Sequence, residues 1–321
     1  MTHAAAATSV AVTGSVAYDH IMNFPGRFKD HILPDKLHVL NVSFLVQELQ
    51  KLRGGCAANV AYALALHGVT PRLVASVGSD FGPYAEWLAA RGVDLSGTRV
   101  HDDCLTASCF ITTDRDNNQI TGFYPGAMGR ARDVTLEGLP GGRPALAIVS
   151  PNDPDAMRAY PAECRRLGIP FVYDPGQQVI ALSGEDLAAG LDGARVLVCN
   201  DYELSVVQQK TGLDVDGLLG RCEVVVTTLG AKGSRVHPRG EAAIEVPAAP
   251  VDEVLDPTGA GDAYRGGFLR GMLGGADWET CARLGTLTAA YCVSARGTSG
   301  YAFQPDEFAR RFEAAFGAAA V

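Results

Sequence analysis

The sequence predicts an α/β protein with a mainly parallel central sheet and a second, small β-sheet. In the middle of the chain, short apolar segments alternate with helical segments, as in a parallel sheet covered by helices on both faces. Residues 21–50 and 106–124 instead contain the alternating polar and apolar positions of half-exposed strands. Late in the chain, a glycine-rich loop leads directly into a helix. These three observations define the predicted architecture.

Composition favours small-molecule chemistry. The 321 residues carry a net charge of -9 and contain no run of Lys or Arg, which argues against nucleic acid as the partner. The apolar stretches are too short to span a membrane, and the Ala-rich start lacks the basic residues of a signal peptide. The eight cysteines are scattered without metal-binding spacing, so most are expected to be buried thiols. We therefore expect a cytoplasmic protein that binds neither nucleic acid nor membrane.

The chain begins with a predicted buried strand at residues 10–16, and Asp19 follows its end. Ligands of open α/β sheets bind beyond the carboxyl ends of the strands. Asp19 is therefore placed to accept hydrogen bonds from substrate hydroxyl groups, although a lone Asp after a strand is often a turn or cap residue.

Two segments predict the small sheet. Residues 37–46 have the pattern of a half-exposed strand, and residues 106–114 and 119–124 flank the polar turn RDNN, as in a hairpin. We expect residues of about 18–48 and 104–126 to form a lid that covers a substrate and excludes water. The alternative is an ordinary edge of the main sheet.

Between these segments, a pair of glycines precedes an apolar helix in RGGCAANVAYALALHG. Gly54 and Gly55 permit close approach of a ligand or a hinge, and Asn59 falls in the first helical turn. The Asn59 amide is able both to donate and to accept a hydrogen bond from a sugar hydroxyl.

The middle and end of the chain supply the remaining elements. Strands are expected at 145–150, 170–175, 195–200 and 222–228, and helices at 154–167, 185–191, 277–295 and 305–316. Asn200 and Glu203 directly follow a strand, where Asn200 is also a candidate helix N-cap. Gly230 and Gly233 lie in a G-x-x-G turn, which is also a routine hairpin.

The stretch LDPTGAGDAYRGGFLRGMLGG at residues 255–275 carries the strongest chemical signal. The amides of Gly259, Ala260, Gly261 and Asp262 belong to a helix N-terminus, and small side chains let a phosphate approach them. A carboxylate beside such an anion site suggests phosphoryl transfer, with Asp262 accepting the proton of an attacking hydroxyl. Glycine-rich helix starts also occur without any ligand.

The motif D-P-T-G-A-G-D followed by A-Y-R-G-G-F resembles the C-terminal signature of the ribokinase (PfkB) family of sugar and nucleoside kinases. The resemblance implies a ribokinase-like three-layer sandwich, with Asp262 as catalytic base and the turn before it as anion hole. RGGCAANVAYALALHG resembles the N-terminal signature, whose glycine pair is the lid hinge. By the same resemblance, Asn200 and Glu203 organise Mg²⁺ through water, Asp256 helps to hold a monovalent cation such as K⁺, and the nucleotide lies along Thr228, Gly230 and Gly233.

Four further segments, GSVAYDHIMNFPGRF, LHVLNVSFLV, FYPGAM and DPGQQ, are similar to the adenosine kinases of mycobacterial type. This similarity implies transfer of the ATP γ-phosphate to the 5′-hydroxyl of adenosine in purine salvage. It places around the nucleoside Ser15, Asp19, Ser43, Gly54, Gly55, Asn59, Phe123 on the purine, and Gln177 at the pocket edge. Where those kinases carry a second aromatic residue, this chain has Cys109, and Phe110 is expected on the opposite face of its strand.

Two alternatives to an adenosine kinase remain, namely a kinase for another nucleoside or a sugar and a nucleoside-binding sensor without turnover. A dinucleotide-binding oxidoreductase is disfavoured because Gly14 lacks the neighbouring glycines of that fingerprint. The pattern is compatible with a monomer or a homodimer.

Overall fold

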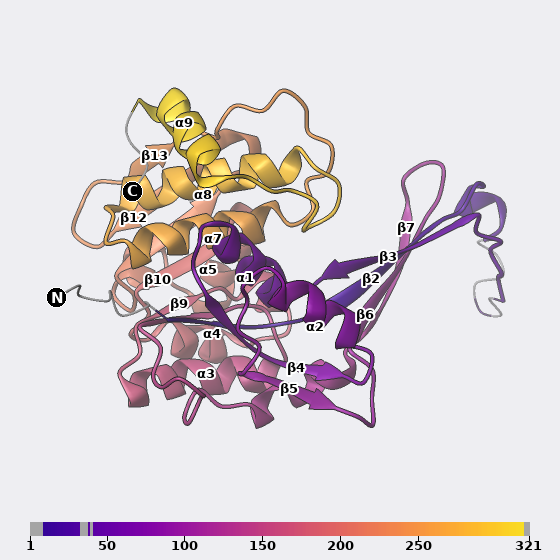
Figure 1. Cartoon of the computed structure of the whole chain (residues 1–321), viewed down its shortest axis with the longest axis horizontal. Helices are drawn as coiled ribbons and strands as arrows, with labels where there is room; N and C mark the ends of the chain where they lie inside the picture. Colours follow the sequence, from indigo (N-terminus) through magenta and orange to yellow (C-terminus); the bar gives the residue numbers. More distant parts are fainter. Residues whose placement is uncertain (1–8, 33–37, 39–40, 318–321) are drawn as a thin grey trace.

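A nine-stranded sheet forms the centre of the computed structural model, which describes residues 9–32, 38 and 41–317. Neighbouring strands run parallel from β11 through to β5, and β12 and β13 are added antiparallel at one edge. The mainly parallel sheet is therefore confirmed (Figure 1). In order across the sheet, its strands are β13 (Ile244–Val246), β12 (Ser234–Pro238), β11 (Val224–Thr228), β10 (Val196–Asn200), β9 (Phe171–Tyr173), β8 (Leu146–Val149), β1 (Val10–Thr13), β4 (Pro71–Gly78) and β5 (Thr98–His101).

Helices cover both faces of this sheet. Alternate strand residues point to opposite sides, so that Val10 and Val12 join one buried cluster while Ala11 joins another. The first cluster packs under α1 (Cys56–Leu66), α2 (Gly82–Ala89), α7 (Ala260–Leu273) and α8 (Trp278–Val293), with α9 (Pro305–Phe316) outside α8. The second packs under α3 (Pro154–Leu167), α4 (Gly184–Leu191), α5 (Asp201–Thr211) and α6 (Val215–Leu219). The result is the predicted three-layer sandwich.

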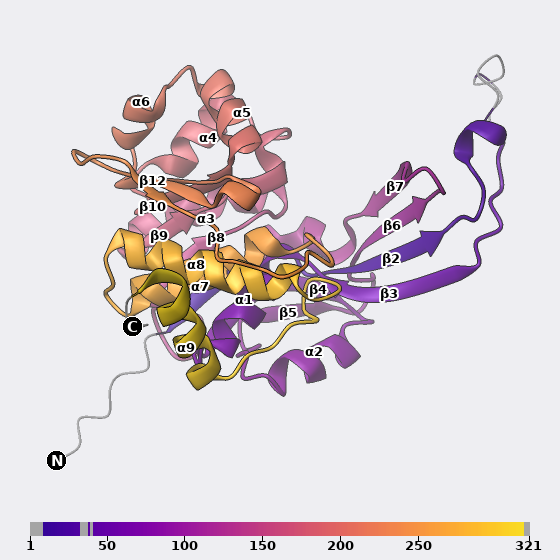
Figure 2. The same cartoon turned by 90° about the horizontal axis from the view of Figure 1, so that it is seen from above.

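The small sheet is separate from the main sheet and extends away from it (Figure 2). Its order is β3 (Glu48–Gly54), β2 (Ala17–Asn23), β6 (Ala107–Thr113) and β7 (Gln119–Tyr124). The β6–β7 hairpin confirms the predicted one, and the alternative of an ordinary edge of the main sheet is wrong.

The strand expected at residues 37–46 does not form where the structure describes this segment. Residues 41–46 have no regular structure, the partner strand of β2 begins only at Glu48, and residues 37, 39 and 40 lie outside the described ranges. The Phe44 ring instead packs against Phe24 and Phe28, with ring centroids 4.9 and 5.0 Å apart. Phe44 thus packs in an aromatic cluster, whereas the neighbouring Leu45 is exposed.

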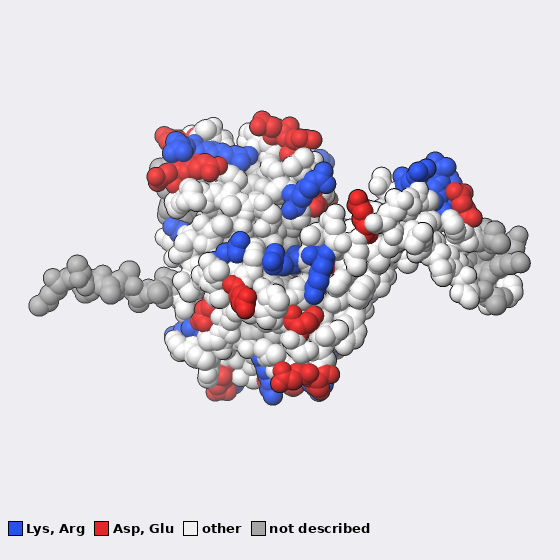
Figure 3. All heavy atoms as spheres, turned by 45° about the vertical axis from the view of Figure 1, so that its right-hand side comes forward, with Lys and Arg blue, Asp and Glu red and all other residues white. Residues whose placement is uncertain are grey.

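The described surface has mixed charge. On the face in Figure 3, the Lys and Arg side chains of the described residues are interspersed with Asp and Glu. All eight cysteines are free thiols, and Cys164, Cys199, Cys222, Cys281 and Cys292 are buried. In the part of the chain that the structure describes, no helix has both the length and the apolar character needed to cross a membrane.

Candidate active site

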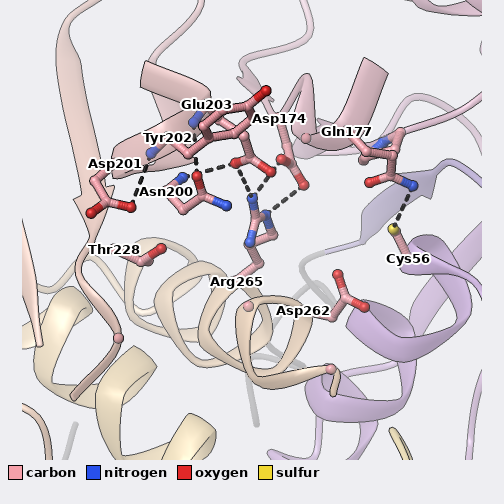
Figure 4. A pocket seen from close by; sticks show the side chains of 15 residues that line it. Cys56, Asp174, Gln177, Asn200, Asp201, Tyr202, Glu203, Thr228, Asp262 and Arg265 are labelled. Carbon is pink, nitrogen blue, oxygen red and sulfur yellow. Dashed lines mark hydrogen bonds and ion pairs between the residues drawn. The ribbon is translucent and has the colours of Figure 1, made fainter. Parts of the chain in front are cut away.

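A cavity of about 520 Å³ opens where the carboxyl ends of β9, β10 and β11 meet the N-terminus of α7 (Figure 4). Parallel strands end at one edge of a sheet, so polar residues that follow different strands are gathered there. The residues that line the cavity are Cys56, Pro151, Asp174, Gly176, Gln177, Asn200, Asp201, Tyr202, Glu203, Thr228, Gly230, Gly259, Gly261, Asp262 and Arg265.

The start of α7 has the geometry of an anion site. Gly259 is the N-cap with φ of 83°, and a Cβ there would lie 2.9 Å from Cβ of Thr298. Within the described residues, the amides of Gly259, Gly261 and Asp262 have no hydrogen-bond acceptor. The Ala260 amide differs from the expectation, because it donates to the Pro257 carbonyl at 3.3 Å as the turn closes. The free amides point out of the helix terminus, where an anion is stabilised.

The Asp262 carboxylate lies in the same cavity and accepts a hydrogen bond from Asn59, with Nδ2 2.8 Å from Oδ2. Asn59 was predicted to bind ribose hydroxyls, but here its amino group holds Asp262. Its buried Oδ1 has no partner among the described residues. Burial raises the pKa of Asp262, and the nearby Arg265 and the Asn59 hydrogen bond oppose this rise. Asp262 is thus a buried carboxylate whose proton affinity is higher than that of an exposed Asp.

Gly54 and Gly55 shape the junction between β3 and α1. A Cβ on Gly54 would lie 2.4 Å from the Asp19 carboxylate, and one on Gly55, at φ of 96°, would lie 2.6 Å from the Ser15 carbonyl oxygen. Ser15 itself is buried, and its hydroxyl accepts from the Cys56 amide at 3.0 Å. The predicted substrate residue Ser15 therefore caps α1 in this structure, while Gly54 leaves room for Asp19.

Asp19, Cys109 and Phe123 form a row across β2, β6 and β7. Asp19 is paired with Cys109, and Cys109 with Phe123, so their side chains lie on one face of the small sheet. Burial, and next the negative charge of Asp262, raise the pKa of Asp19, which places this row within electrostatic reach of Asp262. Phe110 stacks on His20 with centroids 4.6 Å apart, as expected for the opposite face. The Phe123 ring is 52% exposed.

Gln177 and Ser43, two other predicted substrate residues, lie in different parts of the molecule. Gln177 lines the cavity, and its Nε2 lies 3.9 Å from the Cys56 sulfur. Ser43 is exposed and belongs to the connection between β2 and β3, which Figure 2 shows at the far end of the small sheet. The structure thus brings Gln177 to Asp262 but not Ser43.

Asn200 and Glu203 form a reciprocal cap at the start of α5. The Asn200 side chain accepts from the Glu203 amide at 2.8 Å, and the Glu203 carboxylate accepts from the Asn200 amide at 2.8 Å. The capping alternative for Asn200 is therefore realised. Both residues also line the cavity, where Glu203 lies 4.0 Å from Arg265.

A second, mostly apolar cavity of about 530 Å³ adjoins the first and shares Thr228, Gly230 and Gly261 with it. Gly233 also lines this cavity. Its φ is 92°, and a Cβ at this position would lie 2.0 Å from the Val246 carbonyl oxygen, so only glycine fits here. Of the predicted cofactor-binding residues, Thr228, Gly230 and Gly233 line this cavity, whereas Asn200 and Glu203 line only the first. The apolar walls are Ala231, Ala248, Ala249, Pro250, Val251, Val254, Pro257, Ala260, Tyr264, Ala289, Ala290 and Val293.

Asp256 lies next to the anion turn and stabilises its surroundings. Its carboxylate accepts from the amides of Thr258 and Gly297, each at 2.9 Å. Burial alone would raise its pKa, but these hydrogen bonds outweigh burial and lower the pKa. Both carboxylate oxygens thus connect the loop before α7 to the loop after α8.

Sequence reasoning missed Asp174 and Arg265, which form a buried ion pair in the cavity with Nη2 2.6 Å from Oδ1. Burial alone would lower the pKa of Arg265, but Asp174, Asp262 and Glu203 raise it above its ordinary value. A signal existed for both residues. Asp174 follows a buried strand as Asp19 does, and Arg265 lies one helical turn after Asp262.

Comparisons with known proteins identify the family of this chain. A family model described as pfkB family carbohydrate kinase matches residues 7–303. The chain is 33% identical over 314 residues to a nucleoside kinase from Methanothermobacter thermautotrophicus, covering 95% of both chains. It is similar to the structure of Burkholderia thailandensis nucleoside kinase in complex with inosine, with a TM-score of 0.86, 38% identity and coverage of 97% and 99%. The Methanocaldococcus jannaschii nucleoside kinase structure gives a TM-score of 0.85, 28% identity and coverage of 96% and 98%.

Proposed function

Since this chain belongs to the pfkB family of carbohydrate kinases, we propose that it transfers the γ-phosphate of ATP to the 5′-hydroxyl of adenosine, giving AMP and ADP. The observation that carries the proposal is the Asp262 carboxylate beside free main-chain amides at the start of α7. This pair of features provides a proton acceptor and an anion site within one cavity.

The two sides of the cavity fit the two substrates. The row of Asp19, Cys109 and Phe123 offers a carboxylate for ribose hydroxyls and an exposed aromatic ring for a base. The apolar cavity beside Thr228 and Gly230 suits the adenine and ribose of ATP. A nucleoside fits this arrangement better than a sugar alone, because a sugar would leave the Phe123 ring uncovered.

The reaction proposed is direct in-line transfer. Asp262 accepts the proton of the 5′-hydroxyl as its oxygen attacks the γ-phosphorus, and the bond from that phosphorus to the ADP oxygen breaks. The amides of Gly259, Gly261 and Asp262 stabilise the charge on the transferred group. With the small sheet closed as a lid, Asp19 and Asn59 hold the acceptor, and water is excluded.

The donor set fits Mg²⁺ held mainly by phosphate and water. Over the described ranges, no group of at least three His, Cys, Asp or Glu side chains is arranged to hold a metal ion directly. Glu203 and Asn200 are the cavity residues suited to bind the hydrated ion, which would neutralise charge on the phosphates when bound. For a K⁺ site, Asp256 remains the proposed carboxylate. Both Asp256 oxygens already accept hydrogen bonds from backbone amides, so a K⁺ ion there would also need carbonyl oxygens of the neighbouring loops as ligands.

Inosine is the second candidate acceptor. A solved nucleoside kinase that is 38% identical to this chain was determined in complex with inosine. Cys109 is smaller than an aromatic residue, so a base stacked on Phe123 has room on its other side. We place the reaction in the cytoplasm as a step of purine salvage, which is supported by the free thiols and by ATP as the donor.

An acceptor panel tests the function. ADP formation is measured with adenosine, inosine, cytidine, ribose and fructose, each with ATP and Mg²⁺. The proposal expects adenosine to give the highest kcat/KM, with inosine next and the free sugars lowest. A preference for inosine would change only the base that we assign to the acceptor. A preference for ribose or fructose would overturn the proposal that the acceptor is a nucleoside.

A further inference from the structure

Arg265 is the buried cation of an otherwise acidic cavity. Its side chain rises from α7 between Asp174 and Glu203, with Asp262 on its other side (Figure 4). One edge of the guanidinium is used by Asp174, through Nη2 at 2.6 Å from Oδ1 and Nε at 2.5 Å from Oδ2. Arg265 is only 7% exposed, so its orientation is fixed by this contact.

The end of the guanidinium away from Asp174 is held only loosely, with Nη2 4.0 Å from the Glu203 carboxylate. Nη1 donates no hydrogen bond to any described residue. It lies directly over Gly261, where a Cβ would be 2.9 Å from this nitrogen. Gly261 belongs to the turn whose amides are also free, so an unpaired charged donor and unpaired main-chain donors lie side by side. An anion in the cavity is therefore able to accept hydrogen bonds from Nη1 and from these amides together.

We propose that Arg265 is a further catalytic residue, whose Nη1 donates to a non-bridging oxygen of the transferred phosphoryl group. This inference rests on the proposed phosphoryl transfer. The 5′-oxygen forms the new bond to phosphorus, the electron pair of the broken bond leaves with ADP, and the proton goes to Asp262. Arg265 stays protonated throughout and stabilises charge on the group between the two oxygens. Asp174 is the positioning residue that fixes the guanidinium plane.

The competing explanation is an ion pair that only supports the fold. Arg265→Lys separates the two roles, because an ammonium is able to pair with Asp174 but has no second edge to offer to a phosphate. Asp174→Asn is the matched variant, which removes the anchor and leaves Nη1 in the protein. Thermal unfolding of both variants shows whether the fold is retained.

Two readouts test the proposal. In steady-state kinetics, Arg265→Lys is expected to lower kcat at least tenfold, with KM for adenosine within about threefold of the wild-type value. In calorimetry without acceptor, it is expected to weaken binding of a non-hydrolysable ATP analogue at least fivefold more than binding of ADP. Asp174→Asn is expected to reduce the preference for the analogue over ADP, because the guanidinium loses its anchor.

Equal weakening of analogue and ADP in Arg265→Lys, or a wild-type kcat in that variant, would overturn the role of Arg265. If Arg265→Lys fails to fold, an undiminished preference for the analogue over ADP in folded Asp174→Asn overturns the contact, and a reduced preference supports it. The calorimetric comparison needs no acceptor. It therefore decides the contact even if the acceptor panel refutes adenosine, and the two failures are distinguishable.

Discussion

At the scale of single residues, the site depends on how Asp262 is held. Its carboxylate is fixed by the Asn59 amide at 2.8 Å, and the Asn59 side chain is itself buried in the first turns of α1. A hydrogen bond donated to a carboxylate favours the charged form, while burial favours the neutral form. In the proposed mechanism, the balance between these effects sets the pH range in which Asp262 is available as a base.

Asn59→Ala is expected to move the acid limb of the kcat profile to higher pH. The Asn59 hydrogen bond lowers the pKa of Asp262, so its removal leaves burial less opposed and raises that pKa. A base must be deprotonated to act, and activity is therefore lost at a higher pH than in the wild-type enzyme. The measurement is kcat with saturating adenosine and ATP between pH 5 and pH 9, taken as roughly the stability range of most proteins.

Asn200→Ala is the matched control for this profile, since it removes an amide that lines the same cavity without contacting Asp262. Its acid limb is expected to keep the wild-type position whatever its effect on rate. An unshifted limb in Asn59→Ala, or a shift to lower pH, would show that Asn59 does not tune Asp262.

The sequence predicted the individual residues of the site unevenly. Asp262 and its glycines were predictable, because a phosphate requires small side chains and free amides at a helix start. The Asn59 contact was not, since α1 and α7 are separated by about two hundred positions and only packing brings them together. Arg265 was overlooked because its position one turn after Asp262 does not reveal its partner Asp174, which lies 91 positions earlier in the chain.

At the scale of elements, the small sheet presents a polar and an aromatic group on one face. Strand register decides which side chains share that face, so Cys109 joins Asp19 and Phe123 while Phe110 turns away to His20. The β6–β7 hairpin was predictable from its alternation and polar turn. The start of β3 at Glu48 was not, because the Phe44 contacts with Phe24 and Phe28 override the local pattern.

Phe123→Ala is expected to weaken adenosine binding by about 1–3 kcal/mol, the usual contribution of one aromatic ring stacked on a base. Calorimetric titration with adenosine measures the change, which corresponds to about fivefold to 140-fold in Kd. Phe110→Ala is the matched control, because that ring lies on the opposite face of the same hairpin.

The comparison of Phe123→Ala with Phe110→Ala shows whether the base stacks on the face of the small sheet that carries Asp19, Cys109 and Phe123. Loss of affinity in Phe110→Ala as large as in Phe123→Ala would place the base on the other face, or would show that both changes only loosen the sheet. Urea denaturation of the two variants separates these outcomes, since a loosened sheet lowers the free energy of unfolding in both.

At the scale of the whole molecule, one layered structure holds the anion turn and the second, apolar cavity, and a thin extension carries the row of Asp19, Cys109 and Phe123 (Figures 1 and 2). The alternation of apolar strands and helices predicted the sandwich, because each element buries alternate residues in one of two cores. How far the extension stands from the cavity is a property of the fold that no local pattern records.

Closure of the extension predicts a change in hydrogen exchange. Every residue of β7 is exposed, so its amides are expected to exchange more slowly once adenosine and a non-hydrolysable ATP analogue are bound. β13, at the far edge of the main sheet, serves as the internal control and is expected to keep its rate. Equal exchange of β7 with and without the ligands would mean that the small sheet does not act as a lid.

The most direct test of the account is the kinetics of Asp262→Asn, which keeps the shape of the side chain and removes the base. With adenosine and ATP, kcat is expected to fall on the order of 10²-fold or more, the usual scale of a general base. Adenosine binding by calorimetry is expected to stay within about threefold of wild type, since the residues that contact the nucleoside are unchanged. An Asp262→Asn enzyme with undiminished kcat would contradict the central claim that this carboxylate takes the proton of the acceptor hydroxyl.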